Sequence, residues 1–273
     1  MTVISTNTTA NTALVYLNKN SAAQSKALAQ LSSGSRITSA KDDASGLAIA
    51  TGMKSDMAVL QQAATNVQNG AAVLNTADGA LSNISDILTR MKTLTAQAQS
   101  GSSSTTDLSY INAEYTQLTS EIDQIATTSF NGTPLLDGTS AYAAGVNFLV
   151  GTSSTDTVTV QLNGADSTTL GINGTSITSA ASAATAMAAL DTAITTISSA
   201  RANVGATLSR FSFRGDVINT SLENLTAAHS AITDTDIAAT QSAFSSAQTM
   251  TSAAISALSD ANQMNQSLLK LLQ

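Results

Sequence analysis

The chain has 273 residues, with no cysteine or tryptophan, one histidine, one proline and only five phenylalanines. The absence of cysteine excludes a disulfide framework and thiolate chemistry, and a single histidine excludes a two-histidine zinc motif. The net charge is −7, and residues 101–200 hold eight acidic and no basic residues, whereas nucleic-acid binding needs a basic stripe.

The first predicted element is a helix over residues 10–31, after a polar segment, residues 1–9, that we expect to be unstructured in the free chain. Its apolar residues recur at helical spacing and form a stripe along one face, but polar Ser21 and Gln24 occupy two positions of that stripe. A helix with so thin an apolar stripe is not expected to be stable alone. Gly34 is suited to cap its C-terminus. The chain start resembles no Sec-type signal. The apolar positions of this helix are Ala10, Leu14, Leu17, Leu28 and Leu31.

A charged segment, residues 35–46, then interrupts the pattern. It contains Arg36, Lys41, Asp42 and Asp43. Two interpretations stay open, a structural linker and a site of specific contact between molecules.

A coiled-coil seam follows, in which two apolar series repeat every seven residues. The seam predicts a helical rod over residues 59–99 that is about 60 Å long. A second helix over residues 108–125 has a clean stripe and is expected to fold back antiparallel. The first series consists of Leu60, Val67, Leu74, Leu81 and Leu88.

Residues 129–178 are expected to form a small β region. Asn131-Gly132 is a strong signal for a hairpin turn. Residues 146–150 and 156–162 alternate as strands do. A helical stripe returns over residues 187–232, interrupted by Arg201, Gly215 and His229.

The last helix is predicted to start at Asp234 or Thr235, either of which is a suitable N-cap, and to run to Leu272. Polar Thr251 and Asn265 interrupt its main apolar series. No stretch approaches 18 uninterrupted apolar residues, so no membrane span is expected. The main series consists of Ile237, Phe244, Leu258 and Leu272, and the second of Ala247, Ala254, Ala261 and Leu268.

The terminal stripes lack an obvious partner for burial, and each exposed Leu or Ile forgoes about 1.5–3 kcal/mol. One interpretation is a self-contained antiparallel bundle with frayed ends. The other is that the termini gain order when many copies stack. The polar residues within the stripes favour the second, because they weaken an isolated coil and set its register.

Catalytic chemistry has few candidates in this sequence. A Ser-His-Asp triad would have to use His229, which lies on a helical stripe. Asp42-Asp43 and the pair Glu121 and Asp123 do not share a helix face, and we expect them to be solvated. The sequence therefore predicts no enzyme, no cofactor and no metal site.

Residues 31–50, LSSGSRITSAKDDASGLAIA, resemble the N-terminal signature of the bacterial flagellins. Ile122-Asp123, Phe130-Asn131-Gly132 and residues 135–138 resemble the segment that leads into the family's β-hairpin. Ala261-Asn262-Gln263 with residues 268–272 resembles its C-terminal end, although this chain finishes in Gln273 where the family usually has Arg.

The resemblance implies a mainly α fold, an elongated antiparallel helical bundle or coiled coil with a small β-hairpin region. Residues 1–45 and 233–273 are expected to pair as an inner coiled-coil domain. Residues 46–232 are expected to form a rod-like helical domain with the β region at about 129–178. The short middle indicates a member without the family's large outer domains.

The resemblance further implies a structural subunit that polymerises into the hollow flagellar filament for swimming motility. Secretion by the flagellar type III apparatus would read the N-terminus. An export chaperone would hold the C-terminal helix, including Leu268, Leu269 and Leu272, and cap and junction proteins would be further partners. Neither nucleic-acid binding nor membrane insertion is expected.

Self-assembly is predicted to use the stripes and the linker, where ion pairs set register more than strength because exposed pairs contribute about 0–1 kcal/mol each. The hairpin around Pro134 is expected to help choose between two subunit packings. The predicted assembly residues are Leu14, Leu17, Leu28, Leu31, Arg36, Lys41, Asp42, Asp43, Ile237, Phe244, Leu258, Leu268 and Leu272.

The resemblance also implies a contact with an innate immune receptor at Arg90, Leu94 and Glu114, although the neighbouring Thr89, Thr93 and Thr95 depart from the usual pattern. Two rival functions remain. A hook–filament junction protein shares flagellin-like ends, and a secreted coiled-coil effector or translocator would need a strongly apolar helical pair.

Overall fold

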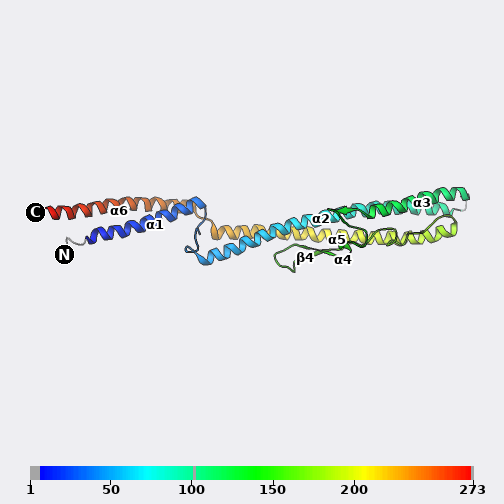
Figure 1. Ribbon diagram of the computed structural model, residues 1–273, viewed down its shortest axis with the longest axis horizontal. Coiled ribbons are helices and arrows are strands. Elements are labelled where there is room, and N and C mark those ends of the chain that lie inside the picture. The colour runs from blue at the N-terminus through cyan, green and yellow to red at the C-terminus, as the bar shows by residue number, and fades with distance from the viewer. Residues whose placement is uncertain (1–6, 101–102, 272–273) are drawn as a thin grey trace. The chain divides into compact units, whose positions relative to one another are not determined.

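The computed structural model describes residues 7–100 and 103–271, without the side chains of Asn265 and of residues 268–271. Long helices dominate these residues, which confirms the predicted mainly α fold (Figure 1). The helices are α1 (Thr8–Ser33), α2 (Ala44–Gln99), α3 (Thr105–Ala126), α4 (Ala141–Ala144), α5 (Ala180–Thr233) and α6 (Ile237–Leu271). The strands are β1 (Ser129–Phe130), β2 (Thr133–Pro134), β3 (Val146–Leu149) and β4 (Thr157–Val160).

The chain divides into two compact units. Residues 56–223 form one, which we call the central unit, and residues 1–55 with 224–273 form the other, the terminal unit. The boundaries fall inside α2 and α5, whereas the sequence placed them at residues 45 and 233.

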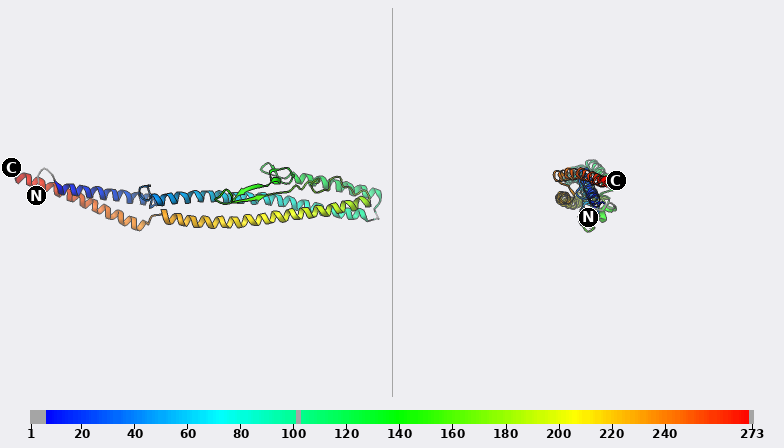
Figure 2. Two further views of the ribbon diagram at one scale, coloured as in Figure 1. Left: turned by 90° about the horizontal axis from the view of Figure 1, so that it is seen from below. Right: turned by 90° about the vertical axis from the view of Figure 1, so that its left-hand side faces the viewer.

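The core of the central unit runs along α2. The predicted heptad positions are buried, with Leu74, Leu81 and Leu88 at most 1% exposed. Helix α3 folds back along α2 (Figures 1 and 2) and buries Ile111, Tyr115 and Ile122. A capping box fixes its start, because the Ser104 and Asp107 side chains each accept the backbone N–H of the other residue.

Helix α2 begins at Ala44, well before the predicted start at residue 59. The Asp43 carboxylate accepts the Gly46 N–H at 2.8 Å and so supplies a donor of the first turn with a partner. The first turns of α2 contain mostly small and polar residues, so no stripe of large side chains marked them as helical.

Two small antiparallel hairpins follow α3. Asn131 and Gly132 both have positive φ, 49° and 78°, and connect β1 to β2, which confirms the predicted turn. Strands β3 and β4 pair from Val146–Val160 to Leu149–Thr157. The Asn66 side chain on α2 donates to the Leu149 carbonyl at 3.0 Å and holds the second hairpin on the helix.

Helix α5 starts seven residues before the predicted position, at residue 180 and not 187. Its first turns bury Ala183 and Ala186, and a stripe of alanines was not recognised from the larger apolar residues alone. Each of the three residues that interrupt the predicted apolar stripe of α5 has a neighbour within the same molecule. Arg201 bonds Asp78 at 2.9 Å, His229 lies 3.3 Å from the Thr233 hydroxyl, and Gly215 faces Val67.

One window of α5 is long and apolar enough to cross a membrane by length and composition, with a mean hydropathy of 1.2. Alanines raise this value although no uninterrupted apolar run exists. The helix buries eight residues within the protein, from Ala183 to Ile218, and 28% of the apolar window is buried.

In the terminal unit α1 and α6 lie side by side (Figures 1 and 2). Gly34 adopts φ 69° after α1 and is the predicted cap. Helix α1 begins at Thr8, with Asn7 as its N-cap, so the expectation that residues 8 and 9 are unstructured is wrong; residues 1–6 lie outside the described residues. The N-cap of α6 is Asp236, whose carboxylate accepts the Ala239 N–H at 3.0 Å, and not Asp234 or Thr235.

Candidate self-assembly interface

Helices α1 and α6 meet along a seam of mostly small residues. The Asn7 amide at the start of α1 donates to the Ala261 carbonyl near the end of α6, and Ser35 pairs with Asp234 at the other end, so the helices are antiparallel. The least exposed positions repeat every three or four residues on both helices, as a coiled coil requires. On α1 they are Ala10, Ala13, Leu17, Asn20, Gln24, Ala27 and Leu31, and on α6 Thr240, Phe244, Ala247, Thr251, Ala254, Leu258 and Ala261.

This seam buries little. Ala27, Ala247 and Ala261 are its fully buried apolar residues, at 5–8% exposure, and the larger side chains of the seam stay half-buried. Asn20, Gln24 and Thr251 place polar groups where a stable coiled coil has apolar ones. The α1–α6 pair is therefore weakly stabilised within one molecule.

The predicted assembly residues of the helices fall into two groups. Leu17, Leu31, Phe244 and Leu258 lie in the seam. Leu14, Leu28 and Ile237 point outward and are 44%, 55% and 54% exposed. The side chain of Leu268 and the whole of Leu272 lie outside the described residues.

Further large apolar side chains are exposed on the same two helices and were missed in the sequence. They fall outside the single stripe that the heptad pattern selects, but a search for any large apolar residue off that stripe finds them. Exposed apolar side chains on both helices of the pair make these helices the candidates for contact with another molecule. These residues are Val15 and Tyr16 on α1 and Met250, Ile255 and Met264 on α6.

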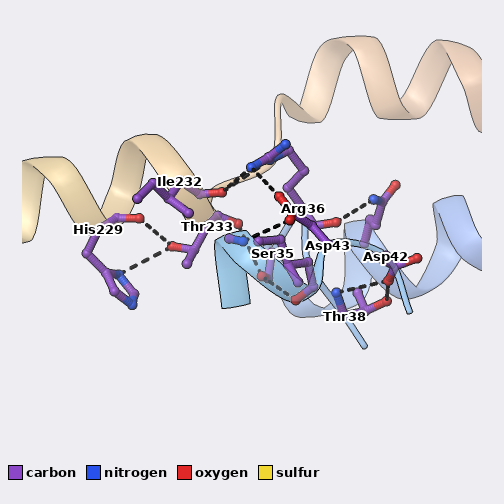
Figure 3. Close-up of polar contacts among 11 residues, drawn as sticks. Ser35, Arg36, Thr38, Asp42, Asp43, His229, Ile232 and Thr233 are labelled. Carbon is purple, nitrogen blue, oxygen red and sulfur yellow. Dashed lines mark hydrogen bonds and ion pairs between the residues drawn. The ribbon is translucent and has the colours of Figure 1, made fainter. Parts of the chain in front are cut away.

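The linker between α1 and α2 binds the C-terminal end of α5 (Figure 3). The Arg36 backbone N–H donates to the Thr233 carbonyl at 2.6 Å, and its guanidinium donates to the Ile232 carbonyl at 2.8 and 3.1 Å. The Ser35 hydroxyl adds a bond to Thr233 O at 3.1 Å. A cation at the last carbonyls of a helix also stabilises the helix dipole.

Asp42 organises the rest of the linker (Figure 3). Its carboxylate accepts hydrogen bonds from the backbone N–H and hydroxyl groups of Thr38 and Ser39, and pairs with Lys26 of α1 at 2.8 Å. Lys26 and then Thr38 lower the pKa of Asp42 far below its ordinary value, because both favour the charged form. The expectation that Asp42 is merely solvated is wrong, since its side chain is only 14% exposed.

The other charged residues of the linker differ from one another in whether they have a partner within the molecule. Asp43 caps α2 and lies 3.8 Å from Arg36. Lys41 is exposed and forms no ion pair with any residue that the structure describes. Arg36, Asp42 and Asp43 thus have partners inside one molecule, and Lys41 keeps its charge available to another.

The three residues predicted to contact an innate immune receptor, Arg90, Leu94 and Glu114, do not form one exposed surface. Arg90 and Glu114 form an ion pair at 2.7 Å on the surface of α2 and α3. Leu94 is 3% exposed and belongs to the core of the central unit. Leu94 thus offers little surface to another protein in this molecule, and the receptor contact stays a prediction.

Among residues 7–100 and 103–271, no group of three His, Cys, Asp or Glu side chains is placed to hold a metal ion. The features that stand out chemically are the exposed apolar rows of α1 and α6 and the linker that joins them to α2 and α5. Their chemistry is that of association between molecules.

Comparisons with known proteins agree with this arrangement. The family model "Bacterial flagellin N-terminal helical region" matches residues 4–141, and "Bacterial flagellin C-terminal helical region" matches residues 187–272. A flagellin of Listeria innocua is 36% identical over 271 residues, which cover 94% of each chain. A flagellar filament core protein of Treponema maltophilum is 35% identical and covers 89% of this chain and 90% of its own.

Among solved structures, the crystal structure of Bacillus cereus flagellin is similar with a TM-score of 0.51 and 35% identity. The match covers 60% of this chain and 94% of that chain. Nearly full coverage of the Listeria innocua relative from both sides shows that these two chains have similar lengths, which agrees with a short form that has no large outer domain.

Proposed function

The chain belongs to the bacterial flagellin family, and from this membership we propose that its copies assemble through the outer faces of α1 and α6 into the flagellar filament. Such a subunit is a structural protein and not an enzyme. Its role is mechanical, since a long stiff polymer transmits rotation in swimming motility. A subunit of the flagellar filament lies outside the cell.

The single observation that carries this proposal is the exposure of Leu14, Leu28, Ile237 and Ile255 on a weakly buried helix pair. Each is 44–55% exposed, so covering the rest of each side chain contributes about 1 kcal/mol, half of the value for full burial. In a single molecule these side chains stay exposed to water. In a filament the terminal helices of neighbouring copies can cover them, and this contact repeats at every subunit. Association therefore stabilises the terminal unit as well as the polymer.

The proposed route out of the cell is flagellar type III export, with the N-terminus as the signal. The proposed partners are an export chaperone on the C-terminal helix at Leu268, Leu269 and Leu272, and the cap and junction proteins of the filament. These proposals rest on the family resemblance, because residues 1–6 and these leucine side chains lie outside the described residues.

Seeded elongation tests the proposal. Purified protein added to filament fragments is expected to extend them by micrometres, as seen by electron microscopy. Leu28→Gln and Ile255→Gln should raise the concentration needed for growth about tenfold or more, because each loses the burial of one large side chain.

Matched controls are available outside α1 and α6. Ser109→Gln on α3 and Thr192→Gln on α5 add the same amide at exposed polar positions and should elongate as the natural protein does. Short rings without long growth would instead favour a hook–filament junction protein. Leakage of liposomes on addition of the chain would favour a translocator.

A further inference from the structure

The chain contains an asparagine followed by a glycine at four places, and this dipeptide can modify itself. The backbone nitrogen of the glycine attacks the side-chain amide carbon of the asparagine, and glycine favours this step because it has no Cβ atom to obstruct the approach. Ring closure requires the backbone to rotate locally, so the structure around each asparagine decides whether it reacts. The four dipeptides are Asn69-Gly70, Asn131-Gly132, Asn163-Gly164 and Asn173-Gly174.

Two of the four dipeptides are held firmly by packing. Asn69 and Gly70 lie inside α2, where helical hydrogen bonds fix the backbone, and a Cβ atom at Gly70 would lie 2.5 Å from the Phe211 ring. Gly164 is buried, and a Cβ atom there would lie 2.8 Å from the Cα atom of Gly138. The backbone has little room to rotate at either place, so both asparagines are expected to keep their side-chain amides.

The dipeptide Asn173-Gly174 is exposed but tied by hydrogen bonds. The Asn173 backbone N–H donates to the Ser167 carbonyl at 3.0 Å, and its side-chain amide nitrogen donates to the Thr168 hydroxyl at 3.3 Å. These bonds restrain the backbone and the side chain that would have to rotate toward each other. Asn173 should therefore react slowly in the folded protein.

The dipeptide Asn131-Gly132, which connects β1 to β2, lacks these restraints. Both residues are exposed, and a Cβ atom at Gly132 would meet nothing within 4 Å. Neither the Asn131 side chain nor the Gly132 N–H has a hydrogen bond to a residue that the structure describes. Asn131 also has a φ of 49°, which residues other than glycine rarely adopt, so loosening of the turn relieves backbone strain.

The hairpin that carries this turn is short. Strands β1 and β2 form two residue pairs, Ser129 with Pro134 and Phe130 with Thr133. Pro134 has no N–H to donate to the ladder. Opening of the Phe130–Thr133 pair is enough to free the turn, and neither of these two residues is fully buried. So small a hairpin can open locally while the core of the central unit stays intact.

We propose that Asn131 is a site of spontaneous deamidation, through ring closure with the backbone nitrogen of Gly132. This nitrogen bonds to Cγ of Asn131 and loses its proton to solvent, the bond from Cγ to the amide nitrogen breaks, and ammonia leaves. Water then opens the resulting succinimide ring. Cleavage at Cγ gives aspartate, and cleavage at the backbone carbonyl carbon gives isoaspartate. Either product adds one negative charge to the net charge of −7.

The two products differ in their effect on the hairpin. Aspartate followed by glycine suits the same turn as Asn-Gly, so β1 and β2 should stay paired. Isoaspartate adds a methylene group to the backbone, and a two-residue turn of this type can then no longer connect the strands in register. One consequence rests on the proposed function: a filament subunit ages in place, so older filaments should contain more of the isoaspartate form.

Ageing of the purified monomer in mildly alkaline buffer, followed by mass spectrometry of its peptides, tests the site, because base removes the proton of the attacking nitrogen. Asn131 should be converted about tenfold faster than the other three asparagines, since each of those must first lose packing or hydrogen bonds. The same protein in concentrated guanidinium chloride is the control, because the four dipeptides are then unfolded and should react at similar rates.

Two variants connect the chemistry to the hairpin. Asn131→Asp contains the aspartate product from the start and should keep the hairpin, with slow amide exchange at Thr133. The aged natural protein should lose this protection at Thr133 in proportion to its isoaspartate content. Asn173→Asp is the matched control and should leave the rate of conversion at Asn131 unchanged.

The outcomes separate this site from the proposed function. Equal conversion of the four asparagines in the folded monomer, or faster conversion of Asn173 than of Asn131, would overturn the proposal. Neither result bears on assembly, because the measurement uses the monomer. Failure of the natural protein to elongate seeds would refute the proposed function and leave the Asn131 site standing.

Discussion

At the scale of single residues, Gly70 of α2 packs tightly against Phe211 of α5. A Cβ atom at Gly70 would lie 2.5 Å from the Phe211 ring, whereas at Gly79 of the same helix it would meet nothing within 4 Å. Both positions are helical, so the difference between them reports packing and not helix propensity.

We predict that Gly70→Ala destabilises the protein by about 1–3 kcal/mol, because Phe211 is held by Phe148 and cannot move freely. Gly79→Ala should stabilise it by about 0.5–1 kcal/mol, since alanine restricts the unfolded chain and favours the helix. Urea unfolding of the monomer measures both. Equal effects of the two substitutions would show that Gly70 is not a packing contact.

We predict that the stability of the linker depends on pH through the carboxylate of Asp42. Its pKa is lowered in the folded state from an ordinary value near 3.8, so the linker is stabilised by ionised Asp42 above that pH and loses this stability as the pH falls below it. The protection factors of the amide hydrogens of residues 36–43, which correct for the pH dependence of intrinsic exchange, should therefore fall below about pH 4.

An Asp42→Asn variant should have a weaker linker at neutral pH and lose most of this acid dependence. Asp56→Asn is the control, because Asp56 is exposed and forms no ion pair with a described residue. An unchanged acid response of the Asp42→Asn variant would assign the effect to other carboxylates.

At the scale of elements, the α1–α6 pair combines a coiled-coil repeat with residues that weaken it. Gln24 lies half-buried in the seam, and Ser25 beside it is exposed. Gln24→Leu should stabilise the pair in the dilute monomer by about 1 kcal/mol and slow proteolysis of the ends several-fold. Ser25→Leu adds the same side chain outside the seam and should not slow proteolysis.

The helices were predictable from the sequence wherever large apolar residues repeat, as at Leu74, Leu81 and Leu88. Helical segments that pack through small residues were not predictable in this way, and for this reason the first turns of α2 and α5 were missed. The Asn131-Gly132 turn was predictable because a hairpin of this kind needs positive φ at both residues.

The linker contacts were the least predictable part of the interface. Arg36 and Ile232 lie 196 residues apart, and nothing in either local pattern indicates that a guanidinium meets that carbonyl. The outward positions of Leu14 and Leu28 were also hidden, because a heptad stripe does not show which edge of it faces the partner helix. Their use by a neighbouring copy stays a prediction.

At the scale of the whole molecule, the two units differ in how they are stabilised. The central unit buries long rows of Leu, Ile and Val, whereas the terminal unit buries Ile37 and a few alanines and leaves large apolar side chains exposed. Local stability follows buried apolar contacts, so the terminal helices should open more readily than the core of α2. Assembly is expected to remove this difference by covering the exposed rows.

Hydrogen exchange of the same protein, first as a dilute monomer and then as seeded filaments, tests this account most directly. We predict that amides of residues 8–33 and 237–271 exchange much faster than those of residues 70–95 in the monomer, and that polymerisation protects them strongly. Equally slow exchange of the terminal helices in the monomer and in the filament would contradict it.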